Sequence, residues 1–185
     1  PSFAGGAFVG RSGLTSVVIP NSVTSIGDWA FEDCSGLQKV EINDLEAWCK
    51  ISFGINGYAN PIYYSHNIFL NGQEIKNLII PETVQELKSA AFYGCSGLTS
   101  VSIGNSVTSI GSGAFCGCSG LTSVVIPNSV TSIGSIAFEG CSGLTSVSIG
   151  NSVNSIGYHA FYGCSGLESI TVESGNTMYD SRDNC

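Results

Sequence analysis

Histidine and cysteine carry most of the chemical reactivity that this sequence offers. The two histidines, His66 and His159, lie far apart, and neither has a zinc-ligand spacing such as HExxH around it. Cys116 and Cys118 form a CGC triplet, which is too short to hold a metal ion without ligands from elsewhere. The sequence shows no cluster of acids, bases, nucleophiles or metal ligands, so we expect no enzymatic activity and no cofactor.

Cysteine instead marks a repeat. One cysteine opens each of five similar segments, and the last four of these are 23 residues apart: Cys34, Cys95, Cys118, Cys141 and Cys164. A cysteine that returns at one structural position behaves as a small apolar core residue. We expect the last four to form a buried ladder of free thiols, because an evenly spaced row gives no thiol a preferred partner. The sequence leaves open the pairing of three other cysteines: Cys49, Cys116 and Cys185.

The 23-residue period extends over most of the chain, which we treat as a single solenoid domain, 1–185. Repeat starts fall at residues 11, 34, 72, 95, 118, 141 and 164. Residues 11–33 match residues 118–140 at all but four positions. Residues 4–10 match the tail of an earlier repeat, and the last unit stops at Cys185 before it is complete. We therefore expect both ends to be cut from a longer array.

Each repeat has the apolar pattern LxxVxI, then a turn, then VxxI and AF. The β-branched run, Val17 to Ile19 in the first copy, predicts a strand, and Pro20 or Gly104 with the following Asn-Ser closes it as a turn. The AFxGC segment is expected to form one helical turn. One repeat buries too little apolar surface to fold alone, so the copies must stack. The pattern predicts a strand-dominated α/β-type repeat solenoid with about seven parallel strands.

The alternation within each strand predicts which side chains face outward. One outward row would contain Ser16, Lys39, Asn77, Ser100, Ser123, Ser146 and Ser169. The next row would contain Val18, Glu41, Ile79, Ser102, Val125, Ser148 and Thr171.

An insert, residues 44–71, breaks the period. Asp44 is expected to cap a short helix through Leu45, Trp48 and Ile51, because its carboxylate can accept from free backbone N–H groups. Asn71 and Gly72 predict a hairpin turn. The insert also holds the densest group of aromatic residues, and aromatic residues supply large contact areas in interfaces. Its candidate partner-binding residues are Trp48, Tyr58, Tyr63, Tyr64 and His66. The alternative, that these aromatics form a satellite core, stays open.

Some repeat positions vary while their neighbours are constant, which indicates exposed sites. The aromatic residues there are candidate contacts of a variable binding face: Trp29, Tyr93, Tyr158, His159 and Tyr162. Drift on a tolerant surface would produce the same variation.

The motif LxxVxIPxSVxxIGxxAFxGC with its 23-residue period resembles the BspA-like leucine-rich-repeat family of bacterial surface and secreted proteins. The resemblance implies a right-handed leucine-rich-repeat superhelix displayed outside the cell and used in adhesion or host contact. It implies no catalytic residue.

The net charge of −8 opposes binding to nucleic acid, and no apolar run is long enough to span a membrane. We expect a monomeric, non-enzymatic binding or adhesion module, extracellular or on the bacterial cell surface, that recognises a protein or glycan of a host or neighbouring cell. A structural spacer of a larger surface protein is the main alternative. A carbohydrate-active enzyme of the parallel β-helix type is a remote one, since the predicted strand face lacks clustered carboxylates.

Overall fold

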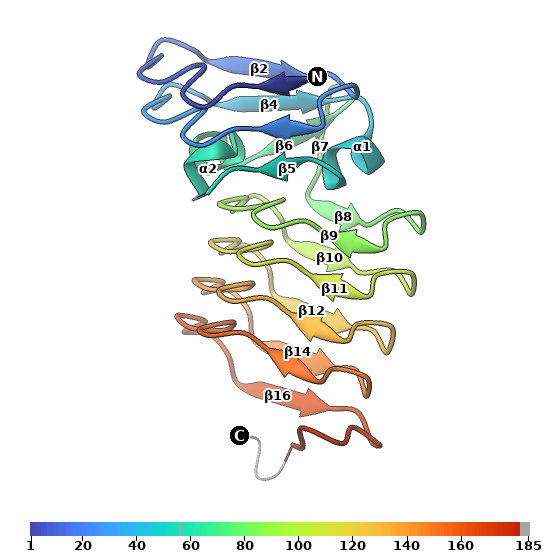
Figure 1. Cartoon of the computed structure of the whole chain (residues 1–185). Coiled ribbons are helices and arrows are strands. Elements are labelled where there is room, and N and C mark those ends of the chain that lie inside the picture. Colours follow the sequence, from blue (N-terminus) through green and yellow to red (C-terminus); the bar gives the residue numbers. More distant parts are fainter. Residues whose placement is uncertain (56, 182–185) are drawn as a thin grey trace.

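The chain winds into a solenoid whose coils stack along one axis (Figure 1). The computed structural model describes residues 1–55 and 57–181. A typical coil contributes one strand to a ladder that we call the front ladder and, after a turn, a shorter strand to a second ladder that we call the back ladder; these names do not follow the view of Figure 1. Apolar side chains from both ladders form one continuous core along the stack.

The front ladder is built from the β-branched run of each repeat. Its parallel strands are β2 (Ser16–Ile19), β4 (Lys39–Ile42), β6 (Ile68–Leu70), β8 (Asn77–Ile79), β10 (Ser100–Ser102), β12 (Ser123–Ile126), β14 (Ser146–Ile149) and β16 (Ser169–Val172). The strand expected for every repeat is present, and β6 from the insert pairs with β4 as an additional one. Equivalent repeat positions lie side by side, as in the pairs Ser16 with Lys39 and Ser123 with Ser146.

Side chains alternate across the front ladder as predicted. The inward positions are occupied by apolar residues, of which Val40, Leu78 and Val124 are buried. The two predicted outward rows are exposed or half-exposed along the whole stack. The predicted register is therefore confirmed.

The back ladder is an element that the sequence did not reveal. Its parallel strands are β1 (Ser2–Phe3), β3 (Ser25–Ile26), β5 (Ser52–Phe53), β9 (Glu86–Leu87), β11 (Ser109–Ile110), β13 (Ser132–Ile133) and β15 (Ser155–Ile156). Each has two residues, which is too short for an alternating pattern, so the sequence predicted only a return segment here. The expected helical turn in AFxGC is wrong as well. This segment forms consecutive turns, and the residue before the cysteine has a left-handed backbone, as at Gly117 (φ 73°) and Gly140 (φ 70°).

The core repeats its contacts from coil to coil. Phe92, Phe115, Phe138 and Phe161 stack in a row with ring centroids 5.3–5.5 Å apart. The cysteines form a second row, in which each thiol donates to a phenylalanine carbonyl 26 residues earlier, about one coil back, at 3.2 Å: Cys118 to Phe92, Cys141 to Phe115 and Cys164 to Phe138. The predicted buried ladder is confirmed, and its thiols are free. Cys49 and Cys116 are also free and buried, whereas Cys185 lies outside the described residues.

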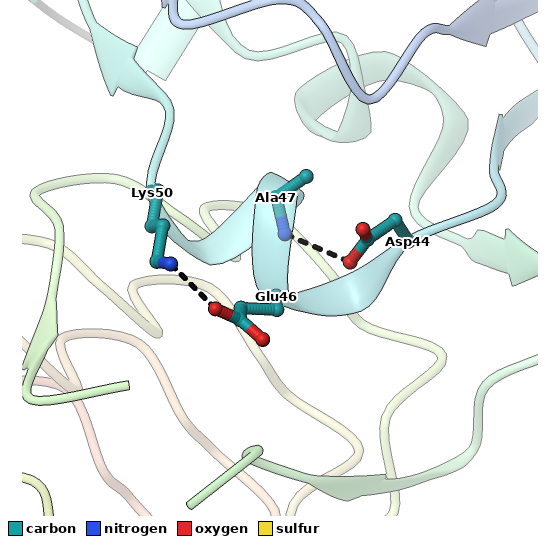
Figure 2. Close-up of polar contacts among 4 residues, drawn as sticks. All are labelled: Asp44, Glu46, Ala47 and Lys50. Carbon is teal, nitrogen blue, oxygen red and sulfur yellow. Dashed lines mark hydrogen bonds and ion pairs between the residues drawn. The ribbon is translucent and has the colours of Figure 1, made fainter. Parts of the chain in front are cut away.

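The insert begins with a short helix and ends with a hairpin. Asp44 caps α1 (Leu45–Cys49) by accepting from the Ala47 N–H at 3.0 Å, and Glu46 pairs with Lys50 (Figure 2). The cap is confirmed, but Ile51 lies beyond the helix, which ends at Cys49, earlier than expected. The expected hairpin joins β6 to β7 (Gln73–Glu74) through Asn71 and Gly72, both with positive φ.

Both ladders are interrupted where the insert meets the next repeat, between β7 and β8 in front and between β5 and β9 behind. The front ladder has a second break between β10 and β12. In regular coils a backbone N–H crosses to the next coil, as from Phe115 to the carbonyl of Ala137 at 2.8 Å. At the interruption, side chains of the insert make these bonds instead. The Asn60 amide donates to the carbonyls of Ala90 (2.7 Å) and Ala91 (3.1 Å), and the Trp48 indole donates to that of Ala91 (3.0 Å).

Asn60 is fully buried, and its side-chain oxygen also accepts from the Ile62 N–H at 2.9 Å. We expect Asn60→Ala to lower the free energy of unfolding by about 2–4 kcal/mol, because the Ile62 N–H loses its acceptor, the carbonyls of Ala90 and Ala91 each lose one donor, and a cavity opens. Urea denaturation measures this change. The exposed Asn105 provides the control, since Asn105→Ala should change stability by less than about 0.5 kcal/mol. Equal effects of the two substitutions would contradict the proposed bridging role.

The buried thiols predict a loss of stability at alkaline pH. Burial raises the pKa of Cys95 and of Cys141 to about 12 and raises the pKa of Cys118, whereas an unperturbed thiol titrates near about 8.5. As the pH rises, the unfolded chain therefore loses protons before the folded chain does, so the free energy of unfolding falls above about pH 8.5. Each thiol contributes up to about 1.4 kcal/mol per pH unit. Urea midpoints at about pH 8 and about pH 10 measure the fall, and Cys118→Ala should show a smaller one than the parent chain.

Candidate functional site

The most varied surface of the solenoid is the edge where the chain turns from a back strand to the next cysteine. We define this turn edge as residues 27–33, 88–94, 111–117, 134–140 and 157–163, with the insert residues 54–55 and 57–66 beside them. It lies on the left of Figure 1, where α2 (Ile62–Ser65) is grouped with the loops. Its backbone is tied from coil to coil by bonds from Ala90 N to Ser112 O (2.9 Å) and from Gly113 N to Ser135 O (2.9 Å).

One position of the turn edge has a left-handed backbone in every described coil that contains it. It is occupied by Gly6, Trp29, Ala90, Gly113, Ile136 and His159, with φ between 54° and 66°. Because glycine, alanine, isoleucine, tryptophan and histidine all adopt the same backbone conformation here, stacking of the coils does not require one particular side chain at this position, although glycine fits the conformation best. At this position Trp29 and His159 are exposed, as their variation predicted.

Four tyrosines meet where the insert covers the turn edge. Tyr63 on α2 contacts Tyr58 of the short 3₁₀ turn η1 (Gly57–Ala59) edge to face, with ring centroids 4.9 Å apart. It contacts Tyr64 in the same way at 4.9 Å and Tyr93 of the following repeat at 5.8 Å. The structure thus brings three of the insert candidates together with one candidate of the variable face.

The hydroxyl groups of this cluster are partly engaged. The Tyr64 hydroxyl accepts from the Asp33 N–H at 2.8 Å. Burial and a hydrogen bond with the Cys116 thiol raise the pKa of Tyr93. Burial, followed by the neighbouring Tyr58, raises the pKa of Tyr63. These phenols therefore stay neutral at physiological pH.

A groove of about 490 Å³ opens beside the tyrosines, and we call it the tyrosine groove. Its walls include Ile55, Tyr58, Tyr63, Tyr93 and Ile136, and its floor includes Ser89, Ala90, Ser112 and Gly113. Gly113 is buried between Tyr93 and Ile136, and a Cβ atom there would crowd both side chains, at 3.3 Å from Cδ2 of Tyr93 and 3.6 Å from Cδ1 of Ile136. A shallower hollow lies on the other side of the Tyr63 and Tyr93 rings and is lined by His66, whose Nδ1 lies 3.2 Å from the Gly94 carbonyl oxygen.

A second aromatic group lies further along the turn edge. The rings of Tyr158 and His159 are stacked with centroids 3.7 Å apart, and those of His159 and Tyr162 are stacked at 4.5 Å. Tyr158 is 74% exposed and Tyr162 is 61% exposed, so the group, which we call the aromatic stack, projects into solvent.

Trp48 requires a correction among the candidate contacts. Its side chain is 1% exposed, packs 5.3 Å from the Phe53 ring and bridges to Ala91, so it belongs to the core and cannot meet a partner. Ile55 was missed, although it is 73% exposed at the groove. The sequence gives it no signal beyond its place in the insert. Ser112, Gly113 and Ile136 stand at repeat positions where the copies differ, but their place in the groove follows only from the fold.

Within residues 1–55 and 57–181, no group of three histidine, cysteine or acidic side chains is arranged to hold a metal ion. None of the helices in the same described part of the chain is both long and apolar enough to cross a membrane.

The repeat pattern identifies the family. A family model described as a BspA type leucine rich repeat region matches the chain in six copies, over residues 2–53 and 63–182. The chain belongs to this leucine-rich repeat family. The match leaves out residues 54–62, the segment that carries Ile55 and Tyr58 of the tyrosine groove. Two of the five wall residues named above therefore lie outside the matched repeats, and Tyr63, Tyr93 and Ile136 lie within them.

Solved leucine-rich repeat structures share the family's fold with this chain. A protein from Eubacterium ventriosum is 22% identical with a TM-score of 0.61, over 88% of this chain and 49% of that one. The pneumococcal vaccine antigen PcpA is 20% identical with a TM-score of 0.61, over 94% of this chain and 54% of that one. TpLRR from T. pallidum is 26% identical with a TM-score of 0.55, over 85% of this chain and 68% of that one.

The chain spans about half the length of the first two structures. A search of curated proteins gives no match.

The contact from Asp33 to Tyr64 can be tested by stability. We expect Tyr64→Phe to lower the free energy of unfolding by about 0.5–1.5 kcal/mol, because the Asp33 N–H loses its acceptor while the ring is kept. Thermal unfolding measures this as a lower Tm. Tyr158→Phe is the matched control, since the Tyr158 side chain is largely exposed and its Tm should not change. A Tyr64→Phe variant as stable as the control would show that the bond contributes nothing.

Proposed function

We propose that this chain is a non-enzymatic binding or adhesion module, secreted or displayed on a bacterial cell surface, that engages a protein or glycan partner through the turn edge. The tyrosine groove is the observation that carries the proposal. Concave sites lined by aromatic side chains with a few hydroxyl groups are the usual form of ligand sites in proteins.

The distribution of exposed aromatic residues supports this location. Tyr58 and Ile55 present apolar surface at the groove, although burying them in a local core would stabilise the chain. Exposed aromatic side chains next to a hollow are typical of recognition sites, where they become hot spots of binding. Family membership and the likeness to a vaccine antigen favour a location outside the cell.

The main alternative is a spacer that holds other domains away from the cell surface. It is favoured by the front face, whose outward rows consist mostly of serine and isolated apolar residues. A spacer needs no groove, so changes in the tyrosine groove should impair a binding module and leave a spacer unaffected.

Binding to panels of host extracellular proteins and glycans tests the proposal. The parent chain is compared with an Ile55→Ser, Tyr58→Ser double variant, in which both changed side chains are exposed and line the groove. We expect the double variant to bind at least about tenfold more weakly, because it removes a wall of the site. Surface plasmon resonance measures the affinity, and circular dichroism confirms that the variant is folded.

The control is Val125→Ser, which removes an exposed apolar side chain from the front face. It should bind as the parent chain does. A weakened Val125→Ser variant with an unaffected double variant would move the site to the front ladder. A parent chain that binds no member of either panel would support the spacer function.

A further inference from the structure

We infer that the ligand of the turn edge is a neutral oligosaccharide that lies along the solenoid axis, from the tyrosine groove to the aromatic stack. This inference rests on the proposed binding function and specifies the chemical class and the path of its ligand.

The groove and the stack are parts of one continuous surface. Ile136 lines the groove, and its N–H donates to the carbonyl of Tyr158 at 2.8 Å, so the stack begins in the coil next to the groove wall. The Gly140 N–H bonds to the carbonyl of Tyr162 in the same way at 2.8 Å. Ala90 and His159 occupy equivalent positions three coils apart, a span of about 14 Å at the usual spacing of parallel strands. A ligand of several linked units can therefore touch both aromatic groups.

The charges on this surface disfavour an anionic ligand. None of the described residues that line the tyrosine groove carries a charged side chain, and its polar groups include the hydroxyls of Tyr58, Tyr63 and Ser112. Glu139 lies beside the proposed ligand path, at the repeat position that is occupied by Cys116 in the preceding coil and by Tyr162 in the following one. The whole chain has a net charge of −8. A neutral ligand rich in hydroxyl groups suits these surroundings, whereas a sulfated or carboxylated one is repelled.

The backbone of the turn edge disfavours an extended peptide. Peptides that bind along repeated strands add to a free edge and exchange main-chain hydrogen bonds with it. Here the N–H groups of Ala90, Gly113 and Ile136 are already bonded to carbonyls of the next coil. The surface thus offers aromatic ring faces and hydroxyl groups, which are the partners of the apolar faces and hydroxyls of sugar rings.

The small residues on the floor explain how a sugar chain can pass between the two aromatic groups. Ser112 is exposed and small, and Gly113 adds no side chain between Tyr93 and Ile136, so no large side chain of this coil stands in the ligand path. Ser112→Trp closes this passage without altering a tyrosine. Ser22→Trp places the same side chain on the exposed turn at the opposite edge and is its control.

Titration calorimetry with neutral oligosaccharides of glucose, mannose, galactose and N-acetylglucosamine, each from disaccharide to hexasaccharide, tests the inference. We expect a neutral hexasaccharide to bind, Ser112→Trp to weaken it at least about tenfold, and Ser22→Trp to leave it unchanged. Tyr158→Ala should weaken the hexasaccharide about three- to tenfold and leave the disaccharide unchanged, because only the longer ligand reaches the stack.

Three results would overturn the inference: tighter binding of hyaluronan or heparin fragments than of neutral chains, equal effects of Tyr158→Ala at both lengths, or no binding of any oligosaccharide. If no oligosaccharide binds but a host protein does, and Ser112→Trp abolishes that binding, the ligand class is wrong and the proposed binding function stands. If neither class binds, both proposals fail.

Discussion

The hydrogen bonds between equivalent backbone positions of successive coils are the interaction on which the whole solenoid depends. They tie the front strands, the back strands and the turn edge, and a single repeat alone cannot make them. A constant period of 23 residues keeps every donor opposite an acceptor. It also places the same side chain above itself in each coil, which produces the rows of stacked phenylalanine rings and buried cysteine thiols.

The insert interrupts this bonding, and its side chains replace what the backbone no longer supplies. The side chains of Asn60 and Trp48 donate to carbonyls of the first repeat after the insert, those of Ala90 and Ala91. These bonds explain why the polar amide of Asn60 is fully buried. At the same interruption Tyr93 contacts Tyr63 of the insert on one side and Gly113 and Cys116 of the next regular coil on the other. The tyrosine groove is thus a structural consequence of joining two stacks through side chains.

Features written locally or repeatedly in the sequence could be predicted from it. The outward rows of the front strands, the buried cysteine ladder, the Asp44 cap and the hairpin at Asn71 belong to this group, because each depends on spacing or on turn chemistry. The back strands were too short to leave a periodic signal. The burial of Trp48 and the meeting of Tyr63 with Tyr93 depend on where the insert lies against later repeats, which no local pattern specifies.

The turn edge is where a repeated chain can vary without loss of its stack. Its backbone bonds are made whatever the side chain, and positions 23 residues apart become neighbours in space. Two nearly identical repeats show this difference. One has Ser112, Gly113 and Cys116, and the other has Tyr158, His159 and Tyr162 at the equivalent positions, which turns a bare floor into an aromatic stack. The left-handed position opposes such changes, because a residue with a Cβ atom is strained there. The left-handed position is nevertheless occupied by Trp29, Ile136 and His159, so the chain tolerates a less stable turn there. A gain in recognition at the turn edge would offset this loss of stability.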